Sequence, residues 1–122
     1  MTQPLALLFY ENLLPGSQLA NRLQDLGWRV QTLNDSTALA RTAEELKPML
    51  VLADLAATRA PVCDGIAKLR RNADTAHIPV IAFGADEAQH KLAVDAGATL
   101  VAGEAAILQH LNQFIEQAMS DF

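Results

Sequence analysis

Five short apolar segments, separated by stretches with helical spacing, constrain the fold of this chain most strongly. The apolar segments are 5–10, 28–33, 49–53, 78–83 and 99–102. Four of them are almost continuously apolar, which is typical of strands that are buried on both faces of a sheet. Segment 28–33 instead alternates, with Trp28, Val30 and Leu33 among polar residues. This alternation predicts a half-exposed strand at an edge of the sheet.

The stretches between the apolar segments predict five helices. Ser17 is placed to cap the first, which Gly27 ends, and Asp35 or Ser36 opens a second that Pro48 stops. The other three are predicted over 65–71, 86–96 and 105–119. The residues expected to face the core are Leu19, Ala20, Leu23, Leu26, Leu39, Ala43, Leu46, Ala88, Leu92, Ala93, Ala96, Ile107, Leu108, Leu111, Ile115 and Ala118.

Regular alternation of strands and helices favours an α/β fold with a parallel sheet and right-handed crossovers. For five strands and five helices, we expect a flavodoxin-like three-layer sandwich with strand order 2-1-3-4-5. This order places segment 28–33 at an edge, in agreement with its alternating pattern. The length of 122 residues predicts one domain spanning 1–122.

The composition narrows the function classes. The net charge of −5 provides no basic patch for nucleic acid, and no apolar run approaches the roughly 20 residues that span a bilayer. The single cysteine, Cys63, suits a reducing compartment, and the amino-terminal residues lack the basic region of a signal peptide. We therefore expect a cytoplasmic protein with no nucleic-acid or membrane partner.

Carboxylates follow the predicted strands at the edge where ligands bind in such sheets. Glu11 follows the first strand, Asp54 the third and Glu104 the fifth, while Gly84 follows the fourth. Because the carboxyl ends of parallel strands share one edge, Glu11 and Asp54 are expected to lie close together, with Glu104 near them. Such carboxylates repel one another, so one has a raised pKa or the group binds a cation.

Several enzyme classes find no support in the sequence. His77, His90 and His110 share no ligand spacing, and Cys63 has no histidine in a recognisable nucleophile arrangement. No G-x-G-x-x-G follows the first strand, and no Asp-x-His-x-x-Gly motif is present. Dinucleotide enzymes, cysteine hydrolases and cobalamin-binding relatives of this architecture are therefore disfavoured.

Four features in order along the chain resemble one signalling family. They are Asp54 at the end of the third strand, Pro-Val-Cys-Asp-Gly at 61–65, Ile-Pro-Val-Ile-Ala at 78–82 and Ala-Gly-Ala at 96–98. Together they resemble the receiver domain of two-component response regulators, the CheY-like domains, over the whole chain. The resemblance implies that Asp54 corresponds to the aspartate that accepts a phosphoryl group from a histidine kinase in a phosphorelay.

The chain departs from the family at the positions around this aspartate. The family's magnesium-binding acidic pair falls on Tyr10 and Glu11, which leaves Glu11 and Asp54 as a weak candidate metal site. The switch positions, where the family has a hydroxyl, an aromatic residue and a lysine, correspond to Gly84, Val101 and Glu104. Segment 55–60 is also longer than the corresponding family loop. Glutamate in place of lysine repels a phosphoryl group, and glycine has no hydroxyl to contact it.

These departures predict a degenerate receiver, or pseudo-receiver, that acts in signal transduction by binding a protein, either a kinase or a downstream regulator. We expect no enzymatic turnover, no required cofactor and at most weak magnesium binding. The alternative is a phosphoacceptor receiver that a histidine kinase phosphorylates at Asp54. Because family members commonly dimerise through the fourth helix, fifth strand and fifth helix, the resemblance also implies a homodimer through the corresponding face.

Overall fold

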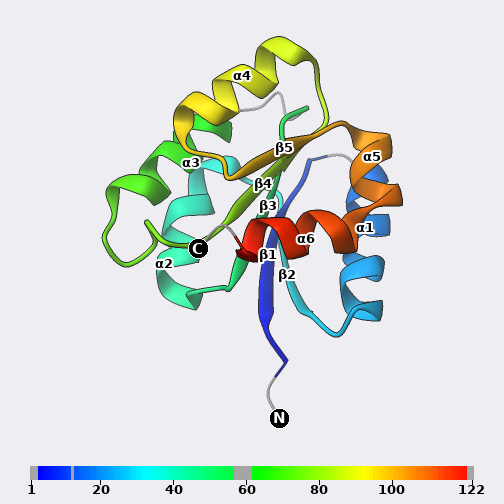
Figure 1. Cartoon of the computed structure of the whole chain (residues 1–122). Coiled ribbons are helices and arrows are strands. Elements are labelled where there is room, and N and C mark those ends of the chain that lie inside the picture. The colour runs from blue at the N-terminus through cyan, green and yellow to red at the C-terminus, as the bar shows by residue number, and fades with distance from the viewer. Residues whose placement is uncertain (1–2, 12, 57–61, 121–122) are drawn as a thin grey trace.

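The computed structural model describes residues 3–11, 13–56 and 62–120, with the side chains of 13–15 excluded. Five parallel strands form one sheet in the order β2-β1-β3-β4-β5 (Figure 1). The strands are β1 (Leu5–Phe9), β2 (Arg29–Leu33), β3 (Leu50–Asp54), β4 (Val80–Phe83) and β5 (Leu100–Ala102). The α/β class, the 2-1-3-4-5 order and the edge position of β2 are therefore confirmed.

Helices cover both faces of this sheet. They are α1 (Leu13–Asp25), α2 (Leu39–Leu46), α3 (Val62–Arg71), α4 (Glu87–Ala96), α5 (Glu104–Gln109) and α6 (Leu111–Ser120), with a 3-10 turn η1 (Ser36–Ala38) before α2. In Figure 1, α2 and α3 lie on one side of the sheet, and α1, α5 and α6 lie on the other. None of the helices in the described ranges is long and apolar enough to cross a membrane.

The alternation of side chains along each strand divides the core into two clusters. On the side of α2, α3 and α4, the strands contribute Leu7, Phe9, Val51, Ala53, Val80 and Ala82. On the side of α1, α5 and α6, they contribute Ala6, Leu8, Leu50, Leu52, Ile81, Phe83 and Ala102. Because β1, β3 and β4 are buried on both faces, these three strands have to be apolar at successive positions. Each fully buried leucine or phenylalanine stabilises the fold by about 1.5–3 kcal/mol.

The prediction of a single last helix over 105–119, and hence of five helices, is wrong. The described residues contain six α-helices, because His110 separates α5 from α6 with φ −126°. The His110 N–H closes α5 by donating to the Ala106 carbonyl, and the His110 carbonyl accepts from the Phe114 N–H at 3.1 Å. Ile107 and Leu111 nevertheless bury in the same cluster on either side of the break. The apolar spacing therefore continues through the break and does not reveal it.

Some predicted helix boundaries and inward positions also need correction. Helix α1 begins at Leu13 rather than after Ser17, and α3 begins at Val62 rather than at 65. Leu26 is 43% exposed and Leu46 is 42% exposed, because each lies at or beyond the last turn of its helix. On α4, Ala88 is exposed and Leu92 is 52% exposed, whereas Ala93 is fully buried. One helical step of about 100° separates Leu92 from Ala93, so only one of them faces the sheet.

The predicted carboxyl-terminal ends of α1 and α4 are confirmed, whereas the role of Asp86 as a cap was not predicted. Asp86 caps α4 by accepting the Gln89 N–H at 3.0 Å, and Gly97, with φ +117°, ends it. Gly27, with φ +93°, follows α1. These positions agree with the preference of side-chain oxygens for helix N-caps and of glycine for left-handed backbone.

Arg70, near the end of α3, ties together two segments at the amino ends of the strands. Its Nε donates to the Gly97 carbonyl at 2.8 Å, and its Nη2 donates to Thr99 Oγ1 at 3.2 Å. Its Nη1 donates to the carbonyls of Ala76 at 2.9 Å and Ile78 at 2.6 Å. Partial burial lowers the pKa of this guanidinium. Arg70 therefore fixes the loops that precede β4 and β5, at the opposite edge from the carboxylates.

Candidate functional site

Asp54 is the last residue of β3 and lies buried at the carboxyl edge of the sheet. Its side chain is only 2% exposed, and Oδ1 accepts a hydrogen bond from the Ala56 N–H at 2.9 Å. Oδ2 is buried and has no hydrogen-bond partner among the described residues. The pairing of β3 with β4 continues one step beyond Asp54, because the Leu55 N–H donates to the Phe83 carbonyl at 2.8 Å. Asp54 is thus held by the sheet itself.

Burial is the main reason that the pKa of Asp54 is raised. Hydrogen bonds from the backbone of Ala56 and Glu11 lower the pKa, while the negative charges of Glu11 and Glu104 raise it. The charges of Glu11 and Glu104 therefore both act on Asp54, as expected from their places after β1 and β5. Within the described residues, however, no three His, Cys, Asp or Glu side chains are placed to hold one metal ion together.

Gly84 follows β4 and lies beside the Asp54 carboxylate. A β-carbon built on Gly84 would be 3.5 Å from Asp54 Oδ1 and 4.0 Å from the Ala56 β-carbon. The backbone of Gly84 has φ +84°, in the left-handed region that favours glycine. Its N–H donates to the Ala102 carbonyl at 3.0 Å, so this turn is also attached to β5.

His90 on α4 contacts the same turn, a role that the sequence analysis did not find. Its Nε2 lies 2.7 Å from the Gly84 carbonyl, and because a carbonyl only accepts, Nε2 is the donor. Asp86, which caps α4, lies four residues earlier, so His90 is in the first turns of the helix. In the sequence, the contact between His90 and Gly84 is indicated only by their short separation on either side of the Asp86 cap.

The other two residues that the resemblance matched to switch positions, Val101 and Glu104, lie on β5 and α5. Val101 is half-buried in β5, where it pairs with Ala82. Glu104 is the first residue of α5 and is exposed, yet its charge still raises the pKa of Asp54. Of the longer segment 55–60, only Leu55 and Ala56 lie in the described residues, so the predicted insertion falls mostly outside them.

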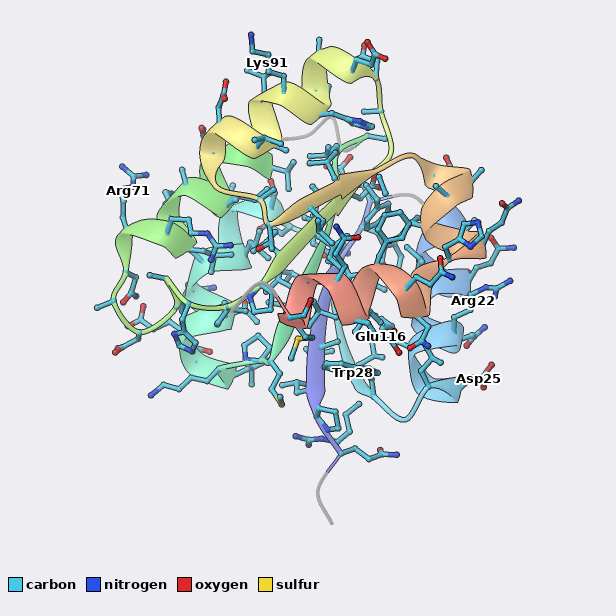
Figure 2. The ribbon with its side chains drawn as sticks, viewed as in Figure 1. Arg22, Asp25, Trp28, Arg71, Lys91 and Glu116 are labelled. Atoms are coloured by element: carbon cyan, nitrogen blue, oxygen red, sulfur yellow. The ribbon has the colours of Figure 1, made fainter. Side chains whose placement is uncertain are left out.

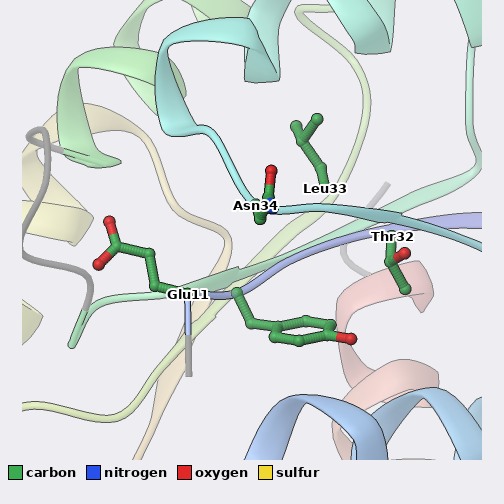
Figure 3. Close-up of a pocket in the computed structure, with 5 residues that line it drawn as sticks. Glu11, Thr32, Leu33 and Asn34 are labelled. Atoms are coloured by element: carbon green, nitrogen blue, oxygen red, sulfur yellow. The ribbon is translucent and has the colours of Figure 1, made fainter. Parts of the chain in front are cut away.

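A groove of about 370 Å³ opens at the carboxyl ends of β1 and β2 and was not predicted. Tyr10, Glu11, Thr32, Leu33 and Asn34 line it, and Figure 3 shows Glu11 at one end and Thr32 at the other. The Tyr10 ring lies directly on Gly16 of α1, where any β-carbon would overlap it. The resemblance matched Tyr10 to the first acid position, and its packing on Gly16 was not foreseen because the helix was expected to begin only after Ser17.

Cys63 and the three histidines do not form a common site. Cys63 is half-buried on α3, and burial, followed by the charge of Asp64, raises the pKa of its thiol. A raised pKa makes the thiol a poorer nucleophile at neutral pH. His77 precedes β4, His90 lies in α4 and His110 separates α5 from α6, so they belong to different parts of the fold.

Solved structures of receiver domains share this arrangement of strands and helices. A candidate response regulator from Chloroflexus aurantiacus matches with a TM-score of 0.89 at 13% identity, covering 98% of this chain and 99% of that chain. The receiver domain of a Pseudomonas aeruginosa sensor histidine kinase, solved with magnesium in its active-site cleft, gives 0.88 at 18% identity with coverages of 98% and 99%. Chemotaxis protein CheY4 of Vibrio cholerae gives 0.84 at 13% identity with coverages of 96% and 99%.

These similarities define the class of fold, a CheY-like receiver-domain fold that extends over almost the whole chain. No protein-family model matches the chain, and no curated protein sequence matches it. The similarity to receiver domains is therefore a similarity of fold.

Proposed function

We propose that this chain is a degenerate receiver domain that acts in cytoplasmic signal transduction by binding another protein, without the standard magnesium-dependent phosphorylation of Asp54. The CheY-like fold supports the signalling class. One observation supports the degenerate site: Gly84, which has no hydroxyl, is the residue that lies against Asp54 Oδ1. The carboxylate that would accept a phosphoryl group thus faces backbone where the family has a side chain that contacts the phosphoryl oxygens.

The charges near Asp54 support the same proposal. Phosphoryl transfer depends on positioning and on neutralising negative charge that spreads over the phosphoryl oxygens. Glu11 and Glu104 both raise the pKa of Asp54, so they would repel a phosphoryl group through the same negative potential. A raised pKa also leaves a larger fraction of Asp54 protonated, and a protonated carboxyl is a poor nucleophile.

Magnesium is the cation that this fold family implies. Mg²⁺ prefers octahedral oxygen ligation, usually from one or two carboxylates together with waters. Asp54 Oδ2, buried without a partner in the described part of the chain, is an oxygen that fits this role, and Glu11 is the second ligand available. Tyr10 replaces the other acid of the family pair. We therefore propose that Glu11 and Asp54 hold Mg²⁺ weakly and that the protein requires no cofactor.

A second candidate function is a phosphoacceptor that a histidine kinase phosphorylates at Asp54. The observation that favours it is the same Oδ2 atom, because a buried carboxylate oxygen without a hydrogen bond is left available for a new bond. In this reading, Glu11 and Asp54 supply the metal site.

Magnesium and beryllofluoride, a phosphoryl mimic, separate the two functions. We would record amide NMR spectra of the protein alone, with Mg²⁺, and with Mg²⁺ plus beryllofluoride, and compare them with Asp54→Asn. The pseudo-receiver predicts no beryllofluoride response at Asp54, Gly84 or the end of β5. Shifts there that require both additions, and that Asp54→Asn abolishes, would contradict it and establish the phosphoacceptor reading. Shifts with Mg²⁺ alone would establish the carboxylate cation site.

The partner class follows from the same proposal. We propose a kinase or a downstream regulator as the partner and the face formed by α4, β5 and the predicted last helix, now α5 and α6, as a homodimer surface. Leu92 and Val94 on α4 are 52% and 56% exposed, which supplies apolar area on this face. Sedimentation of the protein with Leu92→Lys, compared with Leu26→Lys in the turn after α1, tests the dimer. A dimer that only the α4 variant dissociates supports the face, and a monomeric wild type contradicts it.

A further inference from the structure

We propose that a second groove, at the amino ends of β3 and β4, binds a segment of a protein partner in which an apolar side chain stands next to a carboxylate. The inference rests on the proposed function, since it names the chemistry that the interaction module recognises. The groove has a volume of about 350 Å³ and is lined by Lys47, Pro48, Met49, His77, Pro79 and Met119. It lies at the opposite edge of the sheet from Asp54 and shares no residue with that site.

Hydrogen bonds fix the two loops that meet at this groove. The Met49 N–H donates to the Leu5 carbonyl at 2.9 Å, which holds the approach to β3. Arg70 Nη1 donates to the Ile78 carbonyl at 2.6 Å, which holds the approach to β4. Because this backbone is already ordered, it loses little conformational freedom when a ligand binds.

Prolines and methionines make most of the groove apolar. Pro48 and Pro79 are buried, so they lie at its base. Met49 is 51% exposed, and Met119 is half-buried against the core cluster on the α6 side. Methionine side chains are unbranched and adapt their shape to different apolar ligands. The groove therefore suits an apolar side chain, and its volume, at the small end of ligand pockets, limits the occupant to about one or two side chains.

The polar side chains of the groove match an acid. Lys47 carries an ammonium group, and the His77 ring has an N–H donor in every protonation state. Among the described residues that line the groove none is acidic, although the whole chain has a net charge of −5. A carboxylate accepts hydrogen bonds from both an ammonium group and an imidazole N–H. This charge complementarity favours an acidic peptide segment.

The backbone of Lys47 indicates that its side chain has a function. Lys47 is the C-cap of α2 and has φ +49°, in the left-handed region where helices commonly end in glycine. A lysine is less stable than glycine in this conformation, because its β-carbon crowds the backbone. Residues held in such conformations cluster at binding sites and switch regions. We attribute the lysine at this position to binding by its ammonium group.

The test uses capped dipeptides as probes on the whole chain with ¹³C-labelled methionine methyl groups. We would titrate Nα-acetyl-Phe-Glu methylamide and expect saturable shifts at Met49 and Met119. The Phe-Gln probe, which lacks the charge, should bind about threefold more weakly. The Ala-Glu probe, which lacks the large apolar side chain, should bind about tenfold more weakly.

Three outcomes would overturn the proposal. Equal binding of the Phe-Glu and Phe-Gln probes would show that the charge is not recognised. Tighter binding of octanoate than of the Phe-Glu probe would make a small apolar acid the ligand. Methyl shifts that appear on raising the protein concentration, and that block the probe, would make a second copy of the chain the occupant.

Variants assign the recognition of charge to Lys47. Lys47→Gln should weaken binding of the Phe-Glu probe about threefold and leave binding of the Phe-Gln probe unchanged. Lys47→Gly should weaken binding of the Phe-Glu probe equally, and its urea midpoint should stay the same or rise, because glycine adopts φ +49° without strain. Lys91→Gln is the matched control and should bind as the wild type does, since Lys91 is exposed and projects from α4 in Figure 2. Unchanged binding of the Phe-Glu probe by Lys47→Gln would overturn the proposal.

The outcome is independent of the test of the proposed function. Groove binding is read at Met49 and Met119, whereas the phosphoacceptor test is read at Asp54, Gly84 and the end of β5. No binding at the groove together with a silent beryllofluoride titration would reject this ligand and keep the pseudo-receiver. Binding at the groove together with a beryllofluoride response would reject the pseudo-receiver and keep the acidic-peptide site.

Discussion

Gly84 lies against the carboxylate of Asp54, with 3.5 Å between Asp54 Oδ1 and the position that a β-carbon on Gly84 would take. Asp54 pairs with Phe83 in the β3–β4 register, and Gly84 is the residue after Phe83. Asp54 and Gly84 therefore lie next to each other at the carboxyl edge of the sheet. The backbone of Gly84 is hydrogen-bonded to Ala102 of β5 and to His90 of α4. A change in the Asp54 side chain would therefore act on the turn at Gly84, which is hydrogen-bonded directly to β5 and α4.

Asp54→Asn is expected to stabilise the protein at neutral pH. The pKa of Asp54 is raised from its ordinary 3.8, so the folded state binds more protons than the unfolded state above that pH. The contribution of Asp54 to the free energy of unfolding is therefore fully present below pH 3.8, and it is lost as the pH rises through the pKa of the folded state. An amide keeps the acceptor for the Ala56 N–H and removes the buried charge. Urea unfolding should show a gain of roughly 1–2 kcal/mol at pH 7 that shrinks toward pH 4. An equal gain at both pH values would mean that charge is not the cause.

Gly84→Ala is expected to destabilise the fold by about 1 kcal/mol. The β-carbon finds ordinary van der Waals space, with its nearest neighbour at 3.5 Å, so the cost comes from the φ of +84°. Gly103→Ala is the matched control, because Gly103 has φ −69° and a β-carbon there meets no atom within 4 Å. Urea midpoints should fall for Gly84→Ala and stay the same or rise for Gly103→Ala. Equal effects would show that backbone strain does not act at Gly84.

Glu104→Lys is expected to lower the pKa of Asp54 and to strengthen anion binding beside it. The negative charge of Glu104 raises this pKa in the wild type, and a positive charge at the same position reverses the sign. The measurement is a ¹³C titration of the Asp54 carboxyl, together with amide shifts on addition of inorganic phosphate. Glu116→Lys on α6 adds the same charge to an exposed site and is the control. Identical Asp54 titrations in wild type and Glu104→Lys would contradict the electrostatic coupling.

Arg70→Ala is expected to destabilise the protein by about 2–4 kcal/mol. The substitution leaves the carbonyls of Gly97, Ala76 and Ile78 without the guanidinium that they share. Arg70→Lys should recover only part of the loss, because one ammonium cannot reproduce a planar fork of donors. Arg71 is exposed and projects away from the molecule in Figure 2, so Arg71→Ala should leave the free energy of unfolding within about 0.5 kcal/mol of wild type. Similar losses for both alanine variants would contradict the role given to Arg70.

Sequence patterns predicted the parallel sheet because β1, β3 and β4 are buried on both faces and had to be apolar. The strand order, the edge position of β2 and the end of α4 at Ala96 followed from the same patterns. The proximity of Glu11, Asp54 and Glu104 followed from topology alone, since parallel strands bring their carboxyl ends to one edge. The roles of these residues in signalling remain predictions.

Features that depend on tertiary contacts were not visible in the sequence. The break at His110 preserves the apolar spacing on both sides, and the choice between Leu92 and Ala93 depends on how α4 is rotated on the sheet. The groove beside Tyr10 could not be predicted because its presence depends on how closely α1 approaches β1. The close packing of Gly16 on the Tyr10 ring determines this distance. The His90 contact depends on the positive φ of Gly84, which turns the carbonyl toward α4.

Helix α6 also affects how the protein is made. It packs on β4 and buries Ile115 and Ala118 in the cluster that contains Ile81 and Phe83. Synthesis runs from the amino terminus, so a nascent chain that has reached His110 contains all five strands but not the helix that covers this apolar surface. Such a chain is expected to expose Ile81 and Phe83 and to attract chaperones, and the sheet is shielded on both faces only when α6 has left the ribosome.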